Sequence, residues 1–300
     1  MTVQRLETVS DLTDTQREAV ARLLAAATTA DGVPPLSEQF LLGLHPGSGS
    51  SHLLAGSADL AEVTGYAQVA GDAAEIVVAP THRRQGIGSA LLVAMPAGVR
   101  IWSHGDLPGA EAFATARGLE VSRELYRLRR PLDDGDPLPE AVLPPGLVVR
   151  HFVPGRDEEE WLRVNAAAFR DHAEQGRLTR ADLDARMAQP WFERRGLLLV
   201  VVAGEEDRVA AFHWTKVDPV GGTTGEVYVV GVDPAYQGQG LGRPVTLLGL
   251  HQLRRRGVRD VVLYVDGDNA AALRVYRSLG FTTRGLDRMY SRTEDPAVER

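Results

Sequence analysis

The feature that most constrains the fold of this chain is a twelve-residue sequence that occurs twice. Residues 77–88 read VVAPTHRRQGIG and residues 231–242 read GVDPAYQGQGLG, at an offset of 154 positions. The matching positions include Pro80 with Pro234, Gly86 with Gly240, and Gly88 with Gly242. A tandem duplication is the simplest account of this repeat, and it predicts two domains of the same fold.

The length and the proline distribution agree with two domains. The chain has 300 residues, and a typical domain takes about 150. Five of the 17 prolines fall between Pro131 and Gly146, where missing amide donors and fixed φ angles favour an extended linker. We therefore expect an N-terminal domain over residues 1–135, a linker over 136–146 and a C-terminal domain over 147–300.

Composition and charge exclude several classes of protein. The chain has no cysteine, so disulfides, thiolate metal sites and a cysteine nucleophile are excluded. Its net charge is −7, and its only basic block is residues 254–256, so we expect no nucleic-acid partner. The longest apolar run, residues 197–203, is far shorter than a membrane span, and the first ten residues lack a secretory signal pattern. These features predict a cytoplasmic protein with no membrane contact and no metal.

Residue periodicity predicts a mixed order of strands and helices in the second half. We expect strands at 148–152, 197–203, 209–216, 226–232 and 261–265, with a turn of residues 204–207 joining the second and third. We expect helices at 158–169, 180–187, 244–256 and 270–279, the last ending at Gly280. The pattern predicts an α/β fold, in which each domain has a central mixed β-sheet flanked by helices.

A glycine-rich turn, residues 237–242, separates a predicted strand from a predicted helix. Glycine allows positive φ angles and close approach of the backbone to a ligand, and Pro244 suits the first turn of a helix. Free N–H groups and the helix dipole make such a start a pyrophosphate site; a glycine turn without a ligand is the alternative. The glycines come too late for a dinucleotide-binding fingerprint, and the Gly-Lys-Ser/Thr of a P-loop is absent.

These glycines resemble the acetyl-coenzyme A loop of the GCN5-related N-acetyltransferases (GNAT family), which reads Gln/Arg-x-x-Gly-x-Gly/Ala. The chain has it twice, as Arg83-x-x-Gly86-x-Gly88 and Gln237-x-x-Gly240-x-Gly242. Residues 268–281, DNAAALRVYRSLGF, resemble the family's Asn-x-x-Ala-x-x-x-Tyr-x-x-x-Gly-Phe helix. The resemblance implies that Asn269 meets the pantetheine arm of acetyl-CoA and that Tyr276, as general acid, lies near the thioester sulfur.

The first half lacks this second pattern. Aligning Gly118 with Gly280 places Leu107 opposite Asn269 and Ala114 opposite Tyr276. Pro96 also shortens the helix that follows Gly88. We therefore expect the C-terminal domain to be catalytic. The N-terminal domain is expected to be structural, or to bind acetyl-CoA without turnover.

Amine acetylation needs a base, a polarised carbonyl and a proton for the leaving thiolate. Strand alternation puts Glu226 and Tyr228 on one face, so Glu226 is the candidate base, directly or through water; a solvated strand-end glutamate is the alternative. A backbone N–H within residues 230–232 is expected to polarise the carbonyl. Lys216 shares a face with Phe212 and Trp214 and suits a polyol or carboxylate, or else only snorkels to solvent. We expect His213, on the opposite face, to be packed or exposed and not the base.

Longer strings resemble one tandem branch of the GNAT family: FHWTK (212–216), GEVYVVGVDP (225–234), LYVDGDN (263–269), HAEQG (172–176) and ADG (30–32). Members of that branch acetylate the cysteinyl amine of a glucosaminyl-inositol thiol. An α-amino group has a reference pKa of about 7.7–8.0, so a modest base suffices. The alternatives are a tandem acetyltransferase for another small amine and a non-catalytic acetyl-CoA sensor. The internal duplication makes a monomer the expected state.

The resemblance also implies site residues. Acceptor contacts are expected at Asp31, Glu174, Lys216, Glu226 and Tyr264. Acetyl-CoA contacts are expected at Ile76, Val77, Val78, Arg84, Gln85, Gly86, Ile87, Gly88 and Ser89 in the first half, and at Val230, Gly231, Val232, Gln237, Gly238, Gln239, Gly240, Leu241, Gly242, Arg243, Asn269, Ala270, Ala271, Ala272, Leu273 and Arg274 in the second.

Overall fold

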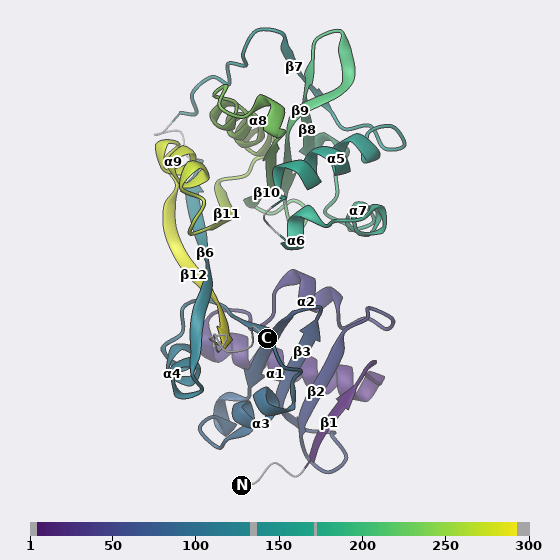
Figure 1. The fold of residues 1–300 in the computed structure, drawn as a ribbon, viewed down its shortest axis with the longest axis vertical. Helices are drawn as coiled ribbons and strands as arrows, with labels where there is room; N and C mark the ends of the chain where they lie inside the picture. The colour runs from purple at the N-terminus through teal and green to yellow at the C-terminus, as the bar shows by residue number, and fades with distance from the viewer. Residues whose placement is uncertain (1–4, 133–136, 171–172, 293–300) are drawn as a thin grey trace, which may run out of the picture. The chain divides into compact units, whose positions relative to one another are not determined.

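The computed structural model describes residues 5–132, 137–170 and 173–292, without the side chains of 173 and 174 (Figure 1). The chain divides into two compact units. The first unit comprises Met1–Leu125 and Gly285–Arg300, and the second comprises Tyr126–Arg284. Two strands, β6 (Leu119–Pro131) and β12 (Thr282–Arg292), contribute residues to both units.

The first unit is a mixed sheet with helices on both faces. Its strands run in the order β1-β2-β3-β4-β5, followed by residues of β12 and β6. Strands β1 to β4 are antiparallel, β4 and β5 are parallel, and β12 is antiparallel to β5. Its other elements are β1 (Arg5–Val9), α1 (Asp14–Asp31), α2 (Glu38–Leu42), β2 (Ser51–Gly56), β3 (Val63–Ala70), β4 (Ala73–Val78), the 3-10 turn η1 (Pro80–His82), α3 (Ile87–Ala94), β5 (Arg100–Ser103) and α4 (Pro108–Ala116).

The second unit repeats this plan. Its strands run in the order β7-β8-β9-β10-β11-β6, with β12 beyond β6. Strands β7 to β10 are antiparallel, and β10 and β11 are parallel. Its elements are β7 (Leu147–His151), α5 (Glu158–Ala168), α6 (Ala173–Gly176), α7 (Arg180–Met187), η2 (Arg194–Gly196), β8 (Leu197–Val202), β9 (Glu205–Lys216), β10 (Thr224–Val232), η3 (Pro234–Tyr236), α8 (Gly242–Arg255), β11 (Asp260–Asp266) and α9 (Ala270–Ser278).

Each face of the second sheet has its own hydrophobic core, because successive side chains of a strand point to opposite faces. On one face, Trp161 of α5 and Leu183 of α7 pack against Phe212 and Trp214 of β9. On the other face lie α8 and α9 (Figure 1). Gly249 of α8 is needed there, because a Cβ at this position would lie about 2 Å from the His213 ring.

The structure confirms the predicted α/β class and two related units, and it corrects two local predictions. The turn predicted for residues 204–207 is wrong, because β9 already begins at Glu205 and only Ala203 and Gly204 form the turn. Gly204 has a φ of 85°, which makes so short a hairpin turn accessible. Helix α8 begins at Gly242, so Pro244 is the third helical residue and not the first. In the described residues, no helix is both long and apolar enough to cross a membrane.

Candidate active site

The centre of the second unit is the place where two parallel strands separate. The pairing of β10 with β11 runs from Thr224 opposite Asp260 to Val227 opposite Leu263 and ends there. On its other edge β10 has a bulge at Tyr228, since Val227 pairs with Thr215 and the next pair joins Val229 to Trp214. The backbone of residues 230–232, predicted to contact acetyl-CoA, therefore follows the bulge on the strand that has parted from β11.

The predicted glycine turn directly follows that strand. Gly238 and Gly240 have φ angles of 75° and 77°, which residues with side chains rarely adopt. The turn leads into α8, whose N-cap Leu241 supplies no side-chain hydrogen bond. Because the first N–H groups of a helix have no intrahelical acceptor, this end can bind an anion.

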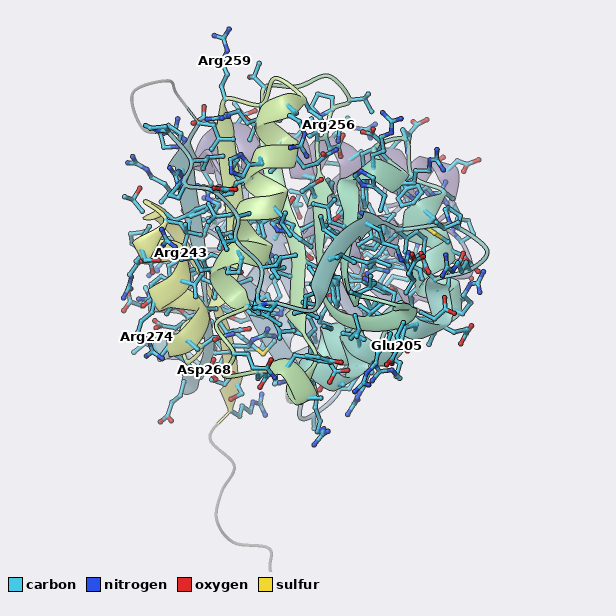
Figure 2. The ribbon with its side chains drawn as sticks, turned by 90° about the horizontal axis from the view of Figure 1, so that it is seen from above. Glu205, Arg243, Arg256, Arg259, Asp268 and Arg274 are labelled. Carbon is cyan, nitrogen blue, oxygen red and sulfur yellow. The ribbon has the colours of Figure 1, made fainter. Side chains whose placement is uncertain are left out.

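Cationic side chains lie near the turn. Arg243 donates from Nη1 to the carbonyl oxygen of Ser278 at 3.2 Å and to its hydroxyl at 2.8 Å, which ties the start of α8 to the end of α9. Figure 2 shows Arg243 and Arg274 on the same side of the second unit, away from Glu205 of the β8–β9 hairpin. Both arginines are among the predicted acetyl-CoA contacts, and their charge suits phosphate groups.

Helix α9 carries the predicted asparagine and tyrosine. Asn269 is the N-cap, and its side-chain oxygen accepts a hydrogen bond from the Ala272 N–H at 3.0 Å. Tyr276 is buried, with its ring 5.7 Å from that of Phe281. Burial raises the pKa of the Tyr276 phenol to about 12, so the hydroxyl keeps its proton at neutral pH. A protonated phenol is the state that a general acid requires.

Glu226 and Lys216 are partners across two strands. They lie opposite each other in the antiparallel register of β10 and β9. The Lys216 Nζ lies 4.9 Å from the centre of the Trp191 ring, 5.4 Å from that of Tyr228 and 4.0 Å from the Asp218 carboxylate. The structure therefore brings these two predicted site residues together with aromatic rings.

Two residues beside Lys216, Trp191 and Tyr228, are not among the predicted site residues, and neither is Arg186, which contacts Tyr228. Arg186 Nε donates to the Tyr228 hydroxyl at 3.1 Å. Strand alternation had already placed Tyr228 on the face of Glu226. No local pattern indicates Trp191 or Arg186, because Trp191 meets Lys216, and Arg186 meets Tyr228, only through the fold.

The other predicted acceptor residues are placed differently. Tyr264 lies on β11, one residue beyond the last pair with β10, and is 45% exposed. Glu174 is on α6, but its side chain, like all of His172, lies outside the described residues. Asp31 ends α1 in the first unit, where its two carboxylate oxygens accept from the Arg83 guanidinium at 2.8 and 2.7 Å.

His213 is packed in the core, as one of the two sequence interpretations has it. It is fully buried, and its Nδ1 lies 2.9 Å from the Val245 carbonyl oxygen of α8. Burial lowers the pKa of His213 to about 4, against the opposing effect of this hydrogen bond. The imidazole is thus neutral and faces α8, on the other side of the sheet from Lys216.

The first unit has a cavity of about 560 Å³ at the corresponding place. Its parallel pair β4–β5 ends at Glu75 opposite Trp102. Of the nine residues predicted to contact acetyl-CoA in this half, Gln85 does not line the cavity; the eight that do are Ile76, Val77, Val78, Arg84, Gly86, Ile87, Gly88 and Ser89. Helix α3 ends at Ala94, before Pro96, and has 8 residues against 14 in α8.

A histidine between two carboxylates lies beside this cavity. His104 Nε2 is 2.9 Å from Glu75, which is fully buried, and Nδ1 is 3.1 Å from Asp287. Burial alone would lower the pKa of His104, but the hydrogen bonds and charges of Asp287 and Glu75 outweigh it and raise the pKa to about 9. The second Glu75 oxygen accepts from the Ser37 N–H at 2.9 Å. Both oxygens of this carboxylate are therefore engaged.

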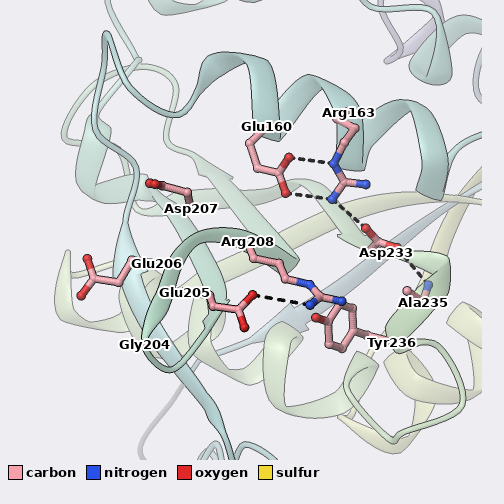
Figure 3. Close-up of a pocket in the computed structure, with 10 residues that line it drawn as sticks. All are labelled: Glu160, Arg163, Gly204, Glu205, Glu206, Asp207, Arg208, Asp233, Ala235 and Tyr236. Atoms are coloured by element: carbon pink, nitrogen blue, oxygen red, sulfur yellow. Dashed lines mark hydrogen bonds and ion pairs between the residues drawn. The ribbon is translucent and has the colours of Figure 1, made fainter.

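A second cavity, of about 690 Å³, lies at the β8–β9 hairpin and contains none of the predicted site residues (Figure 3). Five of its charged groups bind one another: Arg163 bridges Glu160 and Asp233, and Arg208 pairs with Glu205. In the part of the chain that the structure describes, no group of three or more His, Cys, Asp or Glu side chains could hold a metal ion.

A parallel strand pair that separates beside a glycine turn and a helix start is the core arrangement of a GNAT-type acetyltransferase. The family model for the acetyltransferase (GNAT) family matches residues 160–281. A tandem GNAT protein from the clavulanic acid biosynthesis pathway superposes with a TM-score of 0.68, at 19% identity, over 95% of this chain and 98% of that one. A GCN5-related N-acetyltransferase from Sphaerobacter thermophilus gives 0.67, at 24% identity, over 95% and 94%. These likenesses show the fold.

Curated relatives define the branch. Mycothiol acetyltransferase from Thermomonospora curvata is 51% identical over 289 residues, covering 93% of this chain and 94% of that protein. The mycothiol acetyltransferase from Streptomyces coelicolor is 48% identical over 301 residues, covering 96% and 95%. The chain therefore belongs to the mycothiol acetyltransferases, a tandem branch of the GNAT acetyltransferases. These matches confirm the resemblance that the motifs of the sequence indicate.

Proposed function

We propose that this enzyme transfers the acetyl group of acetyl-CoA to the cysteinyl amine of 1D-myo-inositol 2-(L-cysteinylamino)-2-deoxy-glucopyranoside, giving mycothiol. The observation that carries the proposal is the separation of β10 from β11 beside the glycine turn. Glu226 lies on β10, and Lys216 lies opposite it on β9. The names of the relatives support the acceptor. Acetyl-CoA is the donor that the family uses.

Three segments of the second unit would hold acetyl-CoA. Residues 230–232 of β10 would bind the acetyl carbonyl and the pantetheine arm through backbone groups. The turn and helix start, residues 237–243, would bind the pyrophosphate through N–H groups and the helix dipole. The start of α9, residues 269–274, would line the pantetheine arm. Asn269 would contribute there through its amide NH₂, because its oxygen already caps the helix.

Two side chains would move the protons. Glu226 would accept a proton from the acceptor amine, directly or through water, as the nitrogen bonds to the acetyl carbon. Tyr276 would donate its phenolic proton to the departing sulfur as the carbon–sulfur bond breaks, and its buried, protonated state suits that role. Because the chain has no cysteine, no Cys-linked acyl-enzyme can form, and the amine would attack the thioester of acetyl-CoA directly.

Polar side chains would recognise the hydroxyl-rich acceptor. Lys216 and Tyr264 lie on β9 and β11, the strands that flank β10. An ammonium donor and a phenol both suit the hydroxyls of a sugar and an inositol ring. Asp31 and Glu174 stay predictions that rest on the resemblance.

The first unit would bind acetyl-CoA without turnover. Its cavity is lined by most of the predicted contact residues. However, Leu107 and Ala114 stand at the N-cap and buried positions of α4 that Asn269 and Tyr276 hold in α9. The carboxylate at its strand parting, Glu75, is occupied by His104 and the Ser37 N–H.

The test is incubation of the enzyme with acetyl-CoA and the cysteinyl acceptor, followed by mass spectrometry. We expect N-acetylation of this acceptor at rates that exceed those for aminoglycosides and free amino acids by orders of magnitude. Comparable rates on unrelated amines would overturn the acceptor assignment. Tight acetyl-CoA binding with no turnover on any amine would overturn the enzymatic proposal in favour of a sensor.

A further inference from the structure

Two aromatic rings contact the only lysine of the chain. The chain has 33 basic residues, of which Lys216 alone is lysine. Its Nζ lies 4.9 Å from the Trp191 ring centre and 5.4 Å from that of Tyr228, and the two ring centres are 5.0 Å apart. Such distances are those of cation–π contacts, in which the ring face attracts the ammonium. We call Trp191 and Tyr228 the lysine cage.

Different elements bring the cage together. The bulge of β10 lies at Tyr228 and places its ring beside Trp214 and Trp191. Trp191 follows α7 and is 5% exposed. Arg186, in the last turn of α7, holds the Tyr228 hydroxyl with Nε and donates from Nη1 to the Asp182 carbonyl oxygen at 3.0 Å. The ring of Tyr228 is thereby held by the rings of Trp191 and Trp214 and by the hydrogen bond to its hydroxyl.

The residue type at position 216 also carries information. A chain that uses arginine at its other 32 basic positions has lysine where the cation is enclosed by rings. A guanidinium is a planar fork, whereas an ammonium is a compact point charge with three donors on a flexible stem. The lysine stem is flexible and does not fix the position of the ammonium by itself. The cage restricts that position, because the ammonium lies over two rings. Lys216 also ends β9, directly opposite the candidate base Glu226.

We propose that Trp191 and Tyr228 are positioning residues that hold the Lys216 ammonium toward the hydroxyl groups of the acceptor's sugar and inositol, with Arg186 fixing Tyr228. This inference rests on the proposed function and adds to it. The cage acts on acceptor binding through Lys216 and has no part in acetyl-CoA binding or proton transfer. Simple core packing of the same rings makes a different prediction, because lost packing does not discriminate between the two substrates.

The experiment compares Trp191→Leu, Tyr228→Leu and Lys216→Arg with wild type, using the full acceptor and cysteine amide, which has the amine but no sugar. We expect about a tenfold rise in KM for the full acceptor in each variant, with KM for acetyl-CoA unchanged within about twofold. With cysteine amide the variants should match wild type. Tyr228→Phe keeps the ring but loses the Arg186 contact, and we expect a smaller rise in KM.

Phe192→Leu is the matched control. Phe192 belongs to the same aromatic cluster, with its ring 5.9 Å from Trp214, so the substitution removes packing from that cluster. We expect it to lower the melting temperature without raising KM for the acceptor. If Trp191→Leu fails to fold, the acceptor KM values of Tyr228→Leu and Trp191→Phe test the inference instead.

Unchanged acceptor KM in the folded cage variants would overturn the inference, as would an equal rise in both KM values. A Lys216→Arg enzyme with wild-type KM would overturn the requirement for a compact ammonium. These outcomes presuppose wild-type turnover of the full acceptor. Its absence would instead defeat the proposed function, and the inference would fall with it.

Discussion

The two units share a backbone plan but differ at the positions where chemistry is expected. Helices α4 and α9 each have nine residues, and each is followed by a glycine of positive φ, Gly118 and Gly280. The N-cap is Leu107 in one, without a capping side chain, and Asn269 in the other, with one. The comparison teaches that the two units keep the same frame around the parted strands while single side chains at matching positions differ.

The two units also differ in the side chains on the corresponding sheet strands. In the second unit, β9 and β10 present Lys216 and Glu226 beside aromatic rings. In the first, β3, the counterpart of β9, is tied to β2 and to the preceding Ser50 by a buried hydrogen-bonded chain through Ser50, Gln68, Tyr66 and His52. Because a closed network satisfies its own donors and acceptors, it offers little to a polar substrate.

The largest expected effect is on turnover in the second unit. We expect Glu226→Gln to lower kcat about 10³-fold, because the amide cannot accept the amine proton, while acetyl-CoA binding stays unchanged. Steady-state kinetics and calorimetry measure the two quantities. Glu205→Gln, in the exposed β8–β9 hairpin of the same unit, is the control and should retain activity. Equal activity of Glu226→Gln would remove Glu226 from the mechanism.

The phenol that distinguishes α9 from α4 gives the next prediction. Tyr276→Phe keeps the ring against Phe281 but removes the proton donor, so kcat should fall about 10²-fold with little change in melting temperature. Rapid-mixing measurement of thiol release tests this. A wild-type rate would make Tyr276 a packing residue only.

The charged cluster of the first unit predicts a dependence of stability on pH. His104 has a folded-state pKa of about 9, above its unfolded value of 6.5, so its contribution is fully present below pH 6.5 and is lost as pH rises through 9. We expect about 3 kcal/mol of unfolding free energy to disappear over that interval. Chemical denaturation at several pH values measures it. His104→Gln should flatten the profile, and an unchanged slope in that variant would contradict the assignment.

Matched glycine substitutions test the proposed roles of the two glycine turns separately. Gly86 and Gly240 have φ angles of 85° and 77°, and in both a Cβ would meet open space. Gly240→Asp places a carboxylate where the pyrophosphate is expected, so KM for acetyl-CoA should rise more than about tenfold. Gly86→Asp should reduce bound acetyl-CoA from two equivalents to one and leave kcat within about twofold. Complete loss of activity in a folded Gly86→Asp protein would show that the first unit takes part in catalysis.

The smallest effect concerns the same turns. Arg84 has a φ of 63° where the second copy has Gly238 at 75°. This left-handed backbone conformation costs a residue with a side chain roughly 1 kcal/mol. Arg84→Gly should therefore change unfolding free energy only slightly, because relief of strain is offset by the entropy of an added glycine. Gly238→Arg should lower the free energy of unfolding by about 1 kcal/mol. Chemical denaturation measures both variants, and equal shifts in Arg84→Gly and Gly238→Arg would contradict the expected difference between them.

Local patterns in the sequence predict local structure well here. Helix α7 has the predicted bounds, 180–187, and Gly280 follows the end of α9 as expected. Both features depend only on residues that are close together in the sequence. The spacing of the glycines also predicts both turns, and Gly86, Gly238 and Gly240 adopt positive φ angles there. The roles assigned to the site residues stay predictions, since no geometry of a bound substrate tests them.

Contacts between distant segments could not be predicted. Trp191 lies beside Lys216, and Arg186 beside Tyr228, because α7 and its following loop pack against β9 and β10, and no spacing rule relates these positions. The same holds for Asp287, which meets His104 from a position 183 residues away. Strand β9 also began earlier than expected, because hydrophobic periodicity is absent from its exposed first residues.

Strand β12 has a consequence for biosynthesis. Its residues Gly285–Arg292 belong to the first unit and stand between β5 and β6 in the strand order. A nascent chain on the ribosome thus exposes an unfilled slot between these two strands until the whole second unit has been translated. The first unit is therefore expected to complete its folding last, although it is synthesised first.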